Sequence, residues 1–210
     1  MLHNNRQEEN TMENTGCILV TGFEPFGGES INPTGMIIEK LPEEIDGYEI
    51  AKLVLPVEFN RCVELALQAY HRNSVKAVIM LGQAGGRSAI TPETVGKNIM
   101  NARIPDNAGY KPESVLIEES GPELRYSTLP VKKIVEAIKA EGIPAEKSDD
   151  AGEYVCNDLL YGMLGAIDGK VPAGFIHVPY IQQQGHKPYL EFDDVYKGIL
   201  TAIKTVIIDL

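Results

Sequence analysis

The stretch YEIAKLVLPVEFNRCVELALQAYHRNSVKAVIMLG, residues 48–82, decides the fold. Residues 48–57 mix apolar runs with alternation, which is typical of a strand. In residues 58–73 the apolar side chains recur every three or four positions and predict one face of an amphipathic helix: Phe59, Cys62, Val63, Ala66, Leu67 and Tyr70. Residues 75–82 are almost wholly apolar, as expected of a buried strand. A strand, a helix and a strand in succession predict two parallel strands joined by a crossover helix.

The same alternation continues in both directions along the chain. Strands are predicted at 17–23 and 173–180, and helices at 130–142, 153–168 and 193–210. Together these segments predict a single α/β domain with three layers, α/β/α, and a mostly parallel central sheet over residues 16–210. Ligands of such sheets bind beyond the carboxyl ends of the strands. The loops after residues 23, 82 and 178 are therefore expected to carry the functional site.

Composition and charge exclude several classes of function. The formal net charge of −11 argues against nucleic acid or an anionic membrane as the main partner, because both need a basic patch. No apolar run is long enough to span a bilayer. The three cysteines are far apart and suggest neither a disulfide framework nor a zinc site, which favours a cytoplasmic protein. Residues 1–15 are polar and are predicted to form a disordered tail, and Met1 and Met12 are both possible translation starts.

Cys156 admits two interpretations. It lies in the predicted helix 153–168, on the side that carries most of the apolar side chains, and this spacing favours a packed core residue. Asp150 and Glu153, however, form a predicted capping box just before it. Cys156 would then lie in the first two turns, where free N–H groups and the helix dipole favour a thiolate. The pattern alone leaves core packing and nucleophilic catalysis both open.

Three further residues could join Cys156 in a site. His177 interrupts the apolar run GFIHVPY, 174–180, and a buried histidine needs partners for its ring nitrogens. A core histidine with satisfied hydrogen bonds is the simpler explanation. Glu93 and Arg103, taken alone, are typical of surface residues. A cysteine, a buried histidine and a carboxylate would form a nucleophilic set, although periodicity does not show that they meet.

The stretch TGFEPFGG, 21–28, follows the first predicted strand. A phosphate-binding loop is disfavoured, because neither G-x-G-x-x-G nor a Walker pattern is present and Pro25 has no N–H to donate. Phe23 and Phe26 are expected to be apolar walls. They would line either the core or a pocket for a small, flat, mostly apolar group.

Five motifs, taken in order, resemble those of the pyroglutamyl peptidase I family. They are GFEPFGG with NPT, GGRxxIxxE, ARIPDNxGY, AGxYVCNxxxY and GFIHVPY, and the resemblance covers residues 17–210. It implies an α/β/α cysteine peptidase without cofactor or metal, which removes an N-terminal pyroglutamyl residue from peptides. Carried over by motif, Cys156 is the nucleophile, His177 the base and Glu93 the supporting carboxylate.

The resemblance also implies substrate contacts and assembly. Phe23 and Phe26 would line the pocket for the pyrrolidone ring, and Arg103 would lie near the oxyanion. The family is usually oligomeric, so a homo-oligomer, with a tetramer suspected, is expected. Asn101 and Gly96 depart from the usual Asp and Ala and leave rate and substrate preference open. A different cysteine amidase on the same scaffold, or a binding protein in which Cys156 only packs, are the alternatives.

Overall fold

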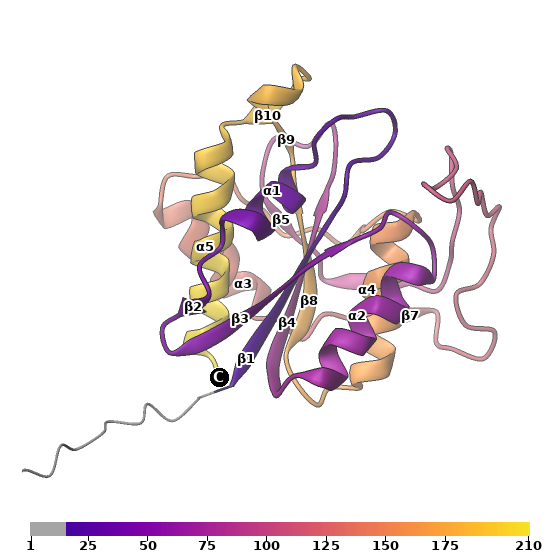
Figure 1. The fold of residues 1–210 in the computed structure, drawn as a ribbon, viewed down its shortest axis with the longest axis horizontal. Coiled ribbons are helices and arrows are strands. Elements are labelled where there is room, and N and C mark those ends of the chain that lie inside the picture. The colour runs from indigo at the N-terminus through magenta and orange to yellow at the C-terminus, as the bar shows by residue number, and fades with distance from the viewer. Residues whose placement is uncertain (1–15) are drawn as a thin grey trace, which may run out of the picture.

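The computed structural model describes residues 16–210, so the predicted tail at 1–15 lies outside the described residues. A central sheet passes between two groups of helices (Figure 1). Its strands are β1 Cys17–Phe23, β2 Glu44–Ile45, β3 Tyr48–Leu55, β4 Val75–Gln83, β5 Thr91–Pro92 and β8 Ala173–Val178. Their order across the sheet is β2-β3-β1-β4-β8-β5. The four central strands are parallel and the two edge strands antiparallel, which confirms the mostly parallel sheet.

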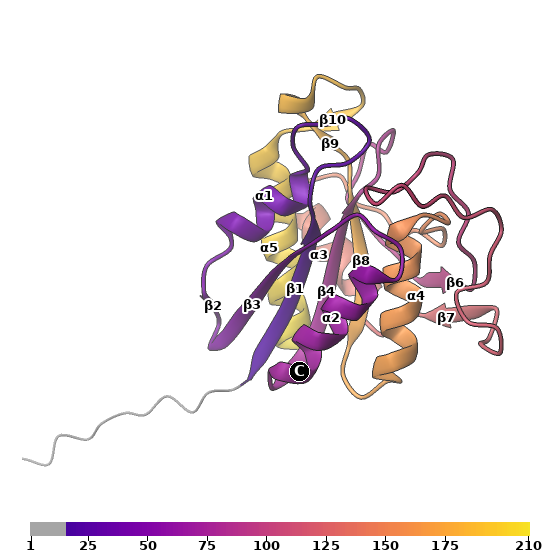
Figure 2. The same ribbon diagram turned by 45° about the vertical axis from the view of Figure 1, so that its right-hand side comes forward.

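Helices cover both faces of this sheet, as Figures 1 and 2 show from two sides. One face carries α1 Pro33–Lys40, α3 Val131–Ala140 and α5 Phe192–Ile208, and the other carries α2 Arg61–Arg72 and α4 Val155–Ile167. Successive side chains of a strand point to opposite faces. Ile18 of β1 accordingly packs in the apolar cluster under α5, and Leu19 packs in the cluster under α4. The predicted α/β/α layers are confirmed.

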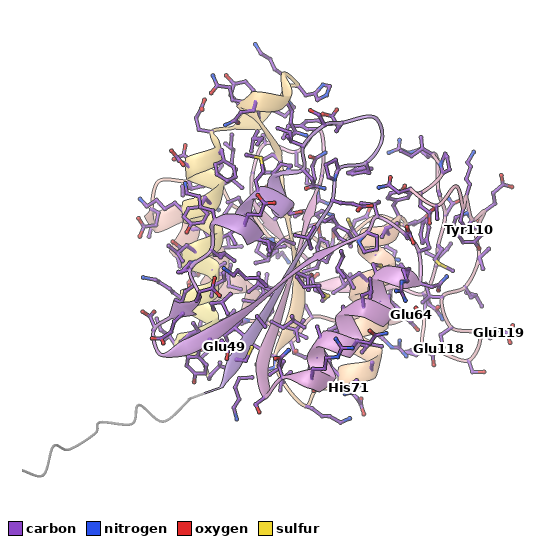
Figure 3. All side chains as sticks on the ribbon, viewed as in Figure 1. Glu49, Glu64, His71, Tyr110, Glu118 and Glu119 are labelled. Carbon is purple, nitrogen blue, oxygen red and sulfur yellow. The ribbon has the colours of Figure 1, made fainter. Side chains whose placement is uncertain are left out.

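The remaining elements lie outside the main sheet. They are the antiparallel pair β6 Val95–Lys97 and β7 Leu124–Tyr126, the short parallel pair β9 Tyr180–Ile181 and β10 Tyr189–Leu190, and a 3-10 turn at Gln182–Gln184. A long loop, 98–123, connects β6 to β7 and extends beyond α2 and α4 in both views. Figure 3 labels Tyr110, Glu118 and Glu119 on this loop. No helix within residues 16–210 has the length and apolar character needed to cross a bilayer.

The start of α4 differs from the prediction. The helix begins at Val155 and no side chain caps it, so the predicted capping box is wrong. The Asp150 carboxylate instead accepts hydrogen bonds from the Gly152 N–H at 3.0 Å and the Lys97 ammonium at 2.9 Å. Asp150 therefore stabilises the turn before the helix rather than the first turn of the helix. Cys156 is therefore the second residue of the helix, closer to its free N–H groups than predicted.

Candidate active site

Sheet register brings Cys156 and His177 together. His177 in β8 lies directly opposite Gly82 in β4. A Cβ atom added to Gly82 would lie 2.9 Å from Cys156 Sγ and 2.5 Å from Phe175 Cζ, so the thiol rests on this glycine. Phe175 and His177 are two residues apart on one strand and share its face, with ring centroids 4.7 Å apart. The thiol lies over Gly82, and His177 is the residue opposite Gly82 on the neighbouring strand.

Glu93 joins them from β5 at the edge of the sheet. β5 pairs with β8, with Thr91 opposite His177, and the Glu93 N–H donates to the Phe175 carbonyl at 2.8 Å. The Glu93 side chain is fully buried, which rules out the surface interpretation. Its Oε1 lies 2.7 Å from His177 Nδ1. An ionised Glu93 assigns the ring proton to Nδ1 and leaves Nε2 free to accept a proton.

Electrostatics keep the cysteine and the histidine neutral at rest. Burial raises the pKa of the Cys156 thiol to about 12, and the charge of Glu93 adds to this rise. Burial also lowers the pKa of His177, although the hydrogen bond and the charge of Glu93 partly offset this. The pKa of Glu93 is lowered: burial acts to raise it, but the combined effects of His177, the Ser148 hydrogen bond and the positive charge of Arg87 outweigh burial. Burial thus outweighs the expected effect of the helix N-terminus on the Cys156 thiol.

The first N–H groups of α4 form a donor pair beside the thiol. The Asn157 and Asp158 N–H groups donate to the Tyr154 carbonyl at 3.0 and 3.2 Å. The backbone N–H groups of Val155 and Cys156 donate to no other residue within residues 16–210, and the Cys156 N–H acts on its own thiol, whose pKa it lowers. Such free N–H groups at a helix start are suited to an anion. These N–H groups are positioned to donate hydrogen bonds to an oxygen that becomes negative next to Cys156.

A narrow pocket with a volume of about 10 Å³ opens beside Cys156. Its lining residues are Phe23, Phe26, Asn32, Val57, Gln83, Tyr154, Val155 and Cys156. Phe23 is buried and Phe26 half-buried, so these two residues contribute to the core and to the pocket wall. Gln83 and Asn32 supply the amide groups among these apolar walls. The chemistry of this lining suits a flat, uncharged group with a few hydrogen-bonding atoms.

Sequence patterns did not single out Asn32, Gln83 or Tyr154. Gln83 is the first polar residue after the apolar run of 75–82 and faces the carboxyl end of the sheet, so its position in the chain was a usable signal. Asn32 precedes Pro33, and Asn followed by Pro is a typical start of a helix. Tyr154 gave no such signal, because its role depends on the turn before α4.

Hydrogen bonds hold the loop that carries Phe26. The Thr34 hydroxyl accepts from the Phe23 N–H at 2.9 Å, and the Asn32 amide donates to the Glu24 carbonyl at 3.0 Å. From the long loop, the Asn107 amide donates to Glu24 Oε1 at 2.8 Å and to the Pro25 carbonyl at 3.0 Å. Polar residues of two motifs therefore fix one pocket wall.

A larger pocket, with a volume of about 410 Å³, adjoins the narrow one. The two share Phe26 and Tyr154. The exposed Arg103 lines the larger pocket together with Lys97 and Glu153, and it does not line the narrow pocket that holds Cys156. The structure thus brings Cys156, His177, Glu93 and the two phenylalanines together and places Arg103 next to them.

Comparisons with known proteins agree on one family. A family model described as pyroglutamyl peptidase, a cysteine peptidase family, matches residues 17–209. Pyrrolidone-carboxylate peptidase 1 of Caldanaerobacter subterraneus subsp. tengcongensis is 46% identical, over 90% of this chain and 97% of its own. The pyrrolidone-carboxylate peptidase of Thermococcus kodakarensis is 44% identical, over 92% and 97%. The crystal structure of pyroglutamyl peptidase I from Bacillus amyloliquefaciens superposes with a TM-score of 0.87 at 40% identity, over 91% and 94%.

Proposed function

The chain belongs to the pyroglutamyl peptidase family, and on this premise we propose that Cys156, His177 and Glu93 hydrolyse the bond after an N-terminal pyroglutamyl residue through a thioester intermediate. The observation that carries the proposal is the placement of the three groups around Gly82 and β8. The thiol lies over Gly82, opposite His177 in the sheet, and His177 Nδ1 lies 2.7 Å from Glu93 Oε1. A cysteine, a histidine and a carboxylate in this relation form a nucleophilic set.

The narrow pocket is the proposed site for the pyrrolidone ring. The ring is flat and uncharged, so the aromatic faces of Phe23 and Phe26 suit it and a charged pocket would not. The Gln83 amide nitrogen can donate to the lactam, while its oxygen accepts from Gln184 at 2.8 Å. The Asn32 amide is engaged with Glu24 and Thr34 and fixes the pocket wall. A substrate with a charged N-terminal amine in place of the lactam would bury that charge without a partner, which excludes it.

In the first half of the reaction, His177 Nε2 takes the proton of the Cys156 thiol as the sulfur attacks the pyroglutamyl carbonyl carbon. Glu93 holds the imidazole by its other nitrogen and stabilises the imidazolium that forms. The negative oxygen of the tetrahedral intermediate accepts hydrogen bonds from the N–H groups of Val155 and Cys156. Arg103 adds positive charge from the adjoining pocket.

In the second half of the reaction, the imidazolium protonates the leaving amine, and the carbon–nitrogen bond breaks to leave a thioester on Cys156. Water then attacks the thioester with His177 as the base. The products are free pyroglutamate and the peptide shortened by one residue, and the thiol is restored.

The test is an assay with the pyroglutamyl amide of a chromogenic amine under reducing conditions. Wild-type protein should release the amine, and Cys156→Ser should lose at least about 10³-fold in kcat. Mass spectrometry of acid-quenched enzyme should find a pyroglutamyl group on the peptide that contains Cys156. Prolyl and free N-terminal amides serve as control substrates. If they are cleaved in preference to the pyroglutamyl amide, the enzyme is another cysteine amidase, and an inert wild type would contradict the proposal altogether.

We further propose that the enzyme acts in the cytoplasm as a homo-oligomer. The three cysteines are unpaired, which suits a reducing compartment. Large apolar side chains of the long loop, among them Ile104, Tyr110 and Leu116, are 45–52% exposed, and an interface would cover them. Light scattering on the purified chain tests the assembly, and cell fractionation tests the location.

A further inference from the structure

We propose that Arg87 is a positioning residue of the reaction, whose guanidinium holds the Glu93 carboxylate against His177 and ties both to the segment that carries Cys156. This inference rests on the proposed roles of Cys156, His177 and Glu93. Arg87 follows β4 in the loop that leads to β5. Its own position is fixed by a turn, in which the Arg87 N–H donates to the Ala84 carbonyl at 3.3 Å.

The turn before Arg87 depends on two glycines. Gly86 has a φ of +90°, a conformation that side chains rarely adopt. At Gly85, an added Cβ would lie 2.3 Å from the Tyr180 hydroxyl. With this backbone, the Arg87 side chain points inward and is only 27% exposed. The GGR motif therefore forms a turn that places the Arg87 guanidinium on the buried side of the loop.

The guanidinium contacts three acceptors at once. Nη1 donates to Glu93 Oε1 at 2.6 Å and to the Thr91 hydroxyl, and Nη2 donates to the Asp150 carbonyl at 2.7 Å. Glu93 and Thr91 belong to the segment of β5, whereas Asp150 lies in the turn that leads into α4. The planar fork of an arginine can bridge two such segments, which the single ammonium of a lysine cannot do with the same geometry.

Charge explains why an arginine is needed at this position. The Glu93 side chain is fully buried, and a buried carboxylate is costly without a partner cation. Over residues 16–210, only His177 and Arg87 place a basic nitrogen within 4 Å of it. His177 is neutral in the resting state and supplies a hydrogen bond but no charge. Arg87 alone neutralises Glu93 before the reaction begins.

The same charge acts on the whole reacting set. The positive charge of Arg87 opposes burial at Cys156 and lowers the pKa of the thiol, and it also lowers the pKa values of His177 and Glu93. The other charged group that faces them is Asp150, which raises the pKa of His177 and is itself paired with Lys97 at 2.9 Å. Removing the charge of Arg87 therefore raises all three pKa values.

The experiment compares Arg87→Met and Arg87→Lys with wild type in the pyroglutamyl amide assay across pH. Arg87→Met should lower kcat per active site about tenfold or more, within the range of a general-base contribution. The acid limb of kcat/KM should move to higher pH, because the His177 pKa rises. Arg87→Lys keeps the charge but cannot reach Glu93 and Asp150 together. It should keep the acid limb of wild type and lose part of kcat.

Arg125→Met is the matched control. Arg125 also bridges a glutamate, Glu118, and a backbone carbonyl of α4, that of Tyr161 at 3.2 Å, but it touches none of the reacting groups. It should lower the melting temperature without moving the acid limb or kcat. If Arg87→Met behaves like Arg125→Met, Arg87 is merely structural and the proposal is overturned. If Arg87→Met does not fold, a wild-type kcat in Arg87→Lys overturns it.

The two proposals fail separately. Full activity in Cys156→Ser would overturn the proposed function and this inference with it. An inactive Cys156→Ser combined with wild-type kcat and pH profile in the Arg87 variants would overturn only the role of Arg87.

Discussion

At the scale of single residues, Gly82 sets the geometry of the site. It leaves room between β4 and α4 for the Cys156 thiol and the Phe175 ring, which would stand 2.9 and 2.5 Å from an added Cβ. Neither neighbour can retreat easily, because Phe175 is fully buried and Cys156 is held at the start of its helix. The space over one glycine thus decides where the sulfur lies.

Gly82→Ala should therefore damage activity more than stability. We expect a loss of about 1–3 kcal/mol in the free energy of unfolding from overpacking. The displaced thiol should cost at least about 10²-fold in kcat, as misplacement of a reacting atom does. Urea unfolding and steady-state assays measure the two effects. A variant that loses stability but keeps wild-type kcat would show that the thiol tolerates the shift.

The pKa shifts predict a broad pH profile. In the proposed mechanism the active form carries a protonated Cys156 and a neutral His177, so activity needs a pH above the His177 pKa and below that of the thiol. Because burial lowers the pKa of His177, the acid limb of kcat/KM should lie below about 6.5, the ordinary value for histidine. The alkaline limb should lie well above about 8.5, the ordinary value for cysteine, because the Cys156 pKa is about 12.

Steady-state rates with the uncharged pyroglutamyl amide measure this profile without titration of the substrate. An alkaline limb near pH 8.5 would contradict the burial of the thiol. An acid limb above pH 7 would instead show that the charge of Glu93 outweighs burial at His177.

Single residues also mark the limit of sequence reasoning. His177 was predicted to be buried and to need ring partners, and the structure confirms its burial at 4% exposure. Glu93 taken alone has the pattern of a surface residue, because its burial comes from β5 pairing with a strand 84 residues later. Without the motif resemblance, no local pattern could connect the two. The contact of Arg87 with Glu93 depends on the same long-range pairing.

At the scale of elements, helices α2 and α4 are joined by a buried carboxylate. Asp158 lies two residues after Cys156 and accepts a hydrogen bond from the Asn60 N–H at 2.6 Å, at the start of α2. Its other oxygen, Oδ1, has no partner within residues 16–210. Burial raises the pKa of Asp158 to about 6, against the lowering effect of the Asn60 N–H.

This carboxylate should make stability depend on pH. The folded pKa, about 6, exceeds the unfolded value of about 3.9, so the contribution is favourable when Asp158 is protonated and is lost as pH rises through 6. Asp158→Asn removes this titration. The unfolding free energy of the variant relative to wild type should increase by on the order of 2–3 kcal/mol from pH 4 to pH 7. Urea unfolding across this range measures it, and a pH-independent difference would contradict the raised pKa.

Element boundaries show which signals are reliable. The apolar runs predict β1 and β4 within one residue, because a strand buried on both faces has a strong composition. Helix α1 has only eight residues and two buried isoleucines, too few for periodicity to reveal it, although Asn32 caps it by accepting from the Thr34 N–H. The false capping box before α4 arises because Asp150 has the right residue type but its oxygen binds Lys97 and Gly152.

At the scale of the whole molecule, the sheet separates the site from half of the core. Cys156 and the pocket lie on the face covered by α2 and α4, whereas α5 packs on the opposite face. Ile203 of α5 and Leu159 of α4 are both fully buried, one on each face. Stability should therefore depend on both faces, and catalysis on one.

Ile203→Ala and Leu159→Ala test this separation as a pair. Each should lower the unfolding free energy by about 2–5 kcal/mol, the usual cost of such truncations. Ile203→Ala should leave kcat/KM within about twofold of wild type at 25 °C. Leu159→Ala should lower kcat/KM further, because the cavity left by the shortened side chain lies in α4, the helix that carries Cys156. Equal losses of kcat/KM in both variants would show that the two faces are coupled.

The order of strands has a consequence for synthesis and refolding. β8 is inserted between β4 and β5, so Glu93 and His177 cannot meet until residue 178 has joined a sheet begun at residue 17. Pairings of such long sequence separation form late and slowly. If Glu93 and His177 act as proposed, a nascent chain lacks an active site until its sheet has received β8. In refolding, the return of hydrolysis reports the closing of the sheet rather than its first collapse.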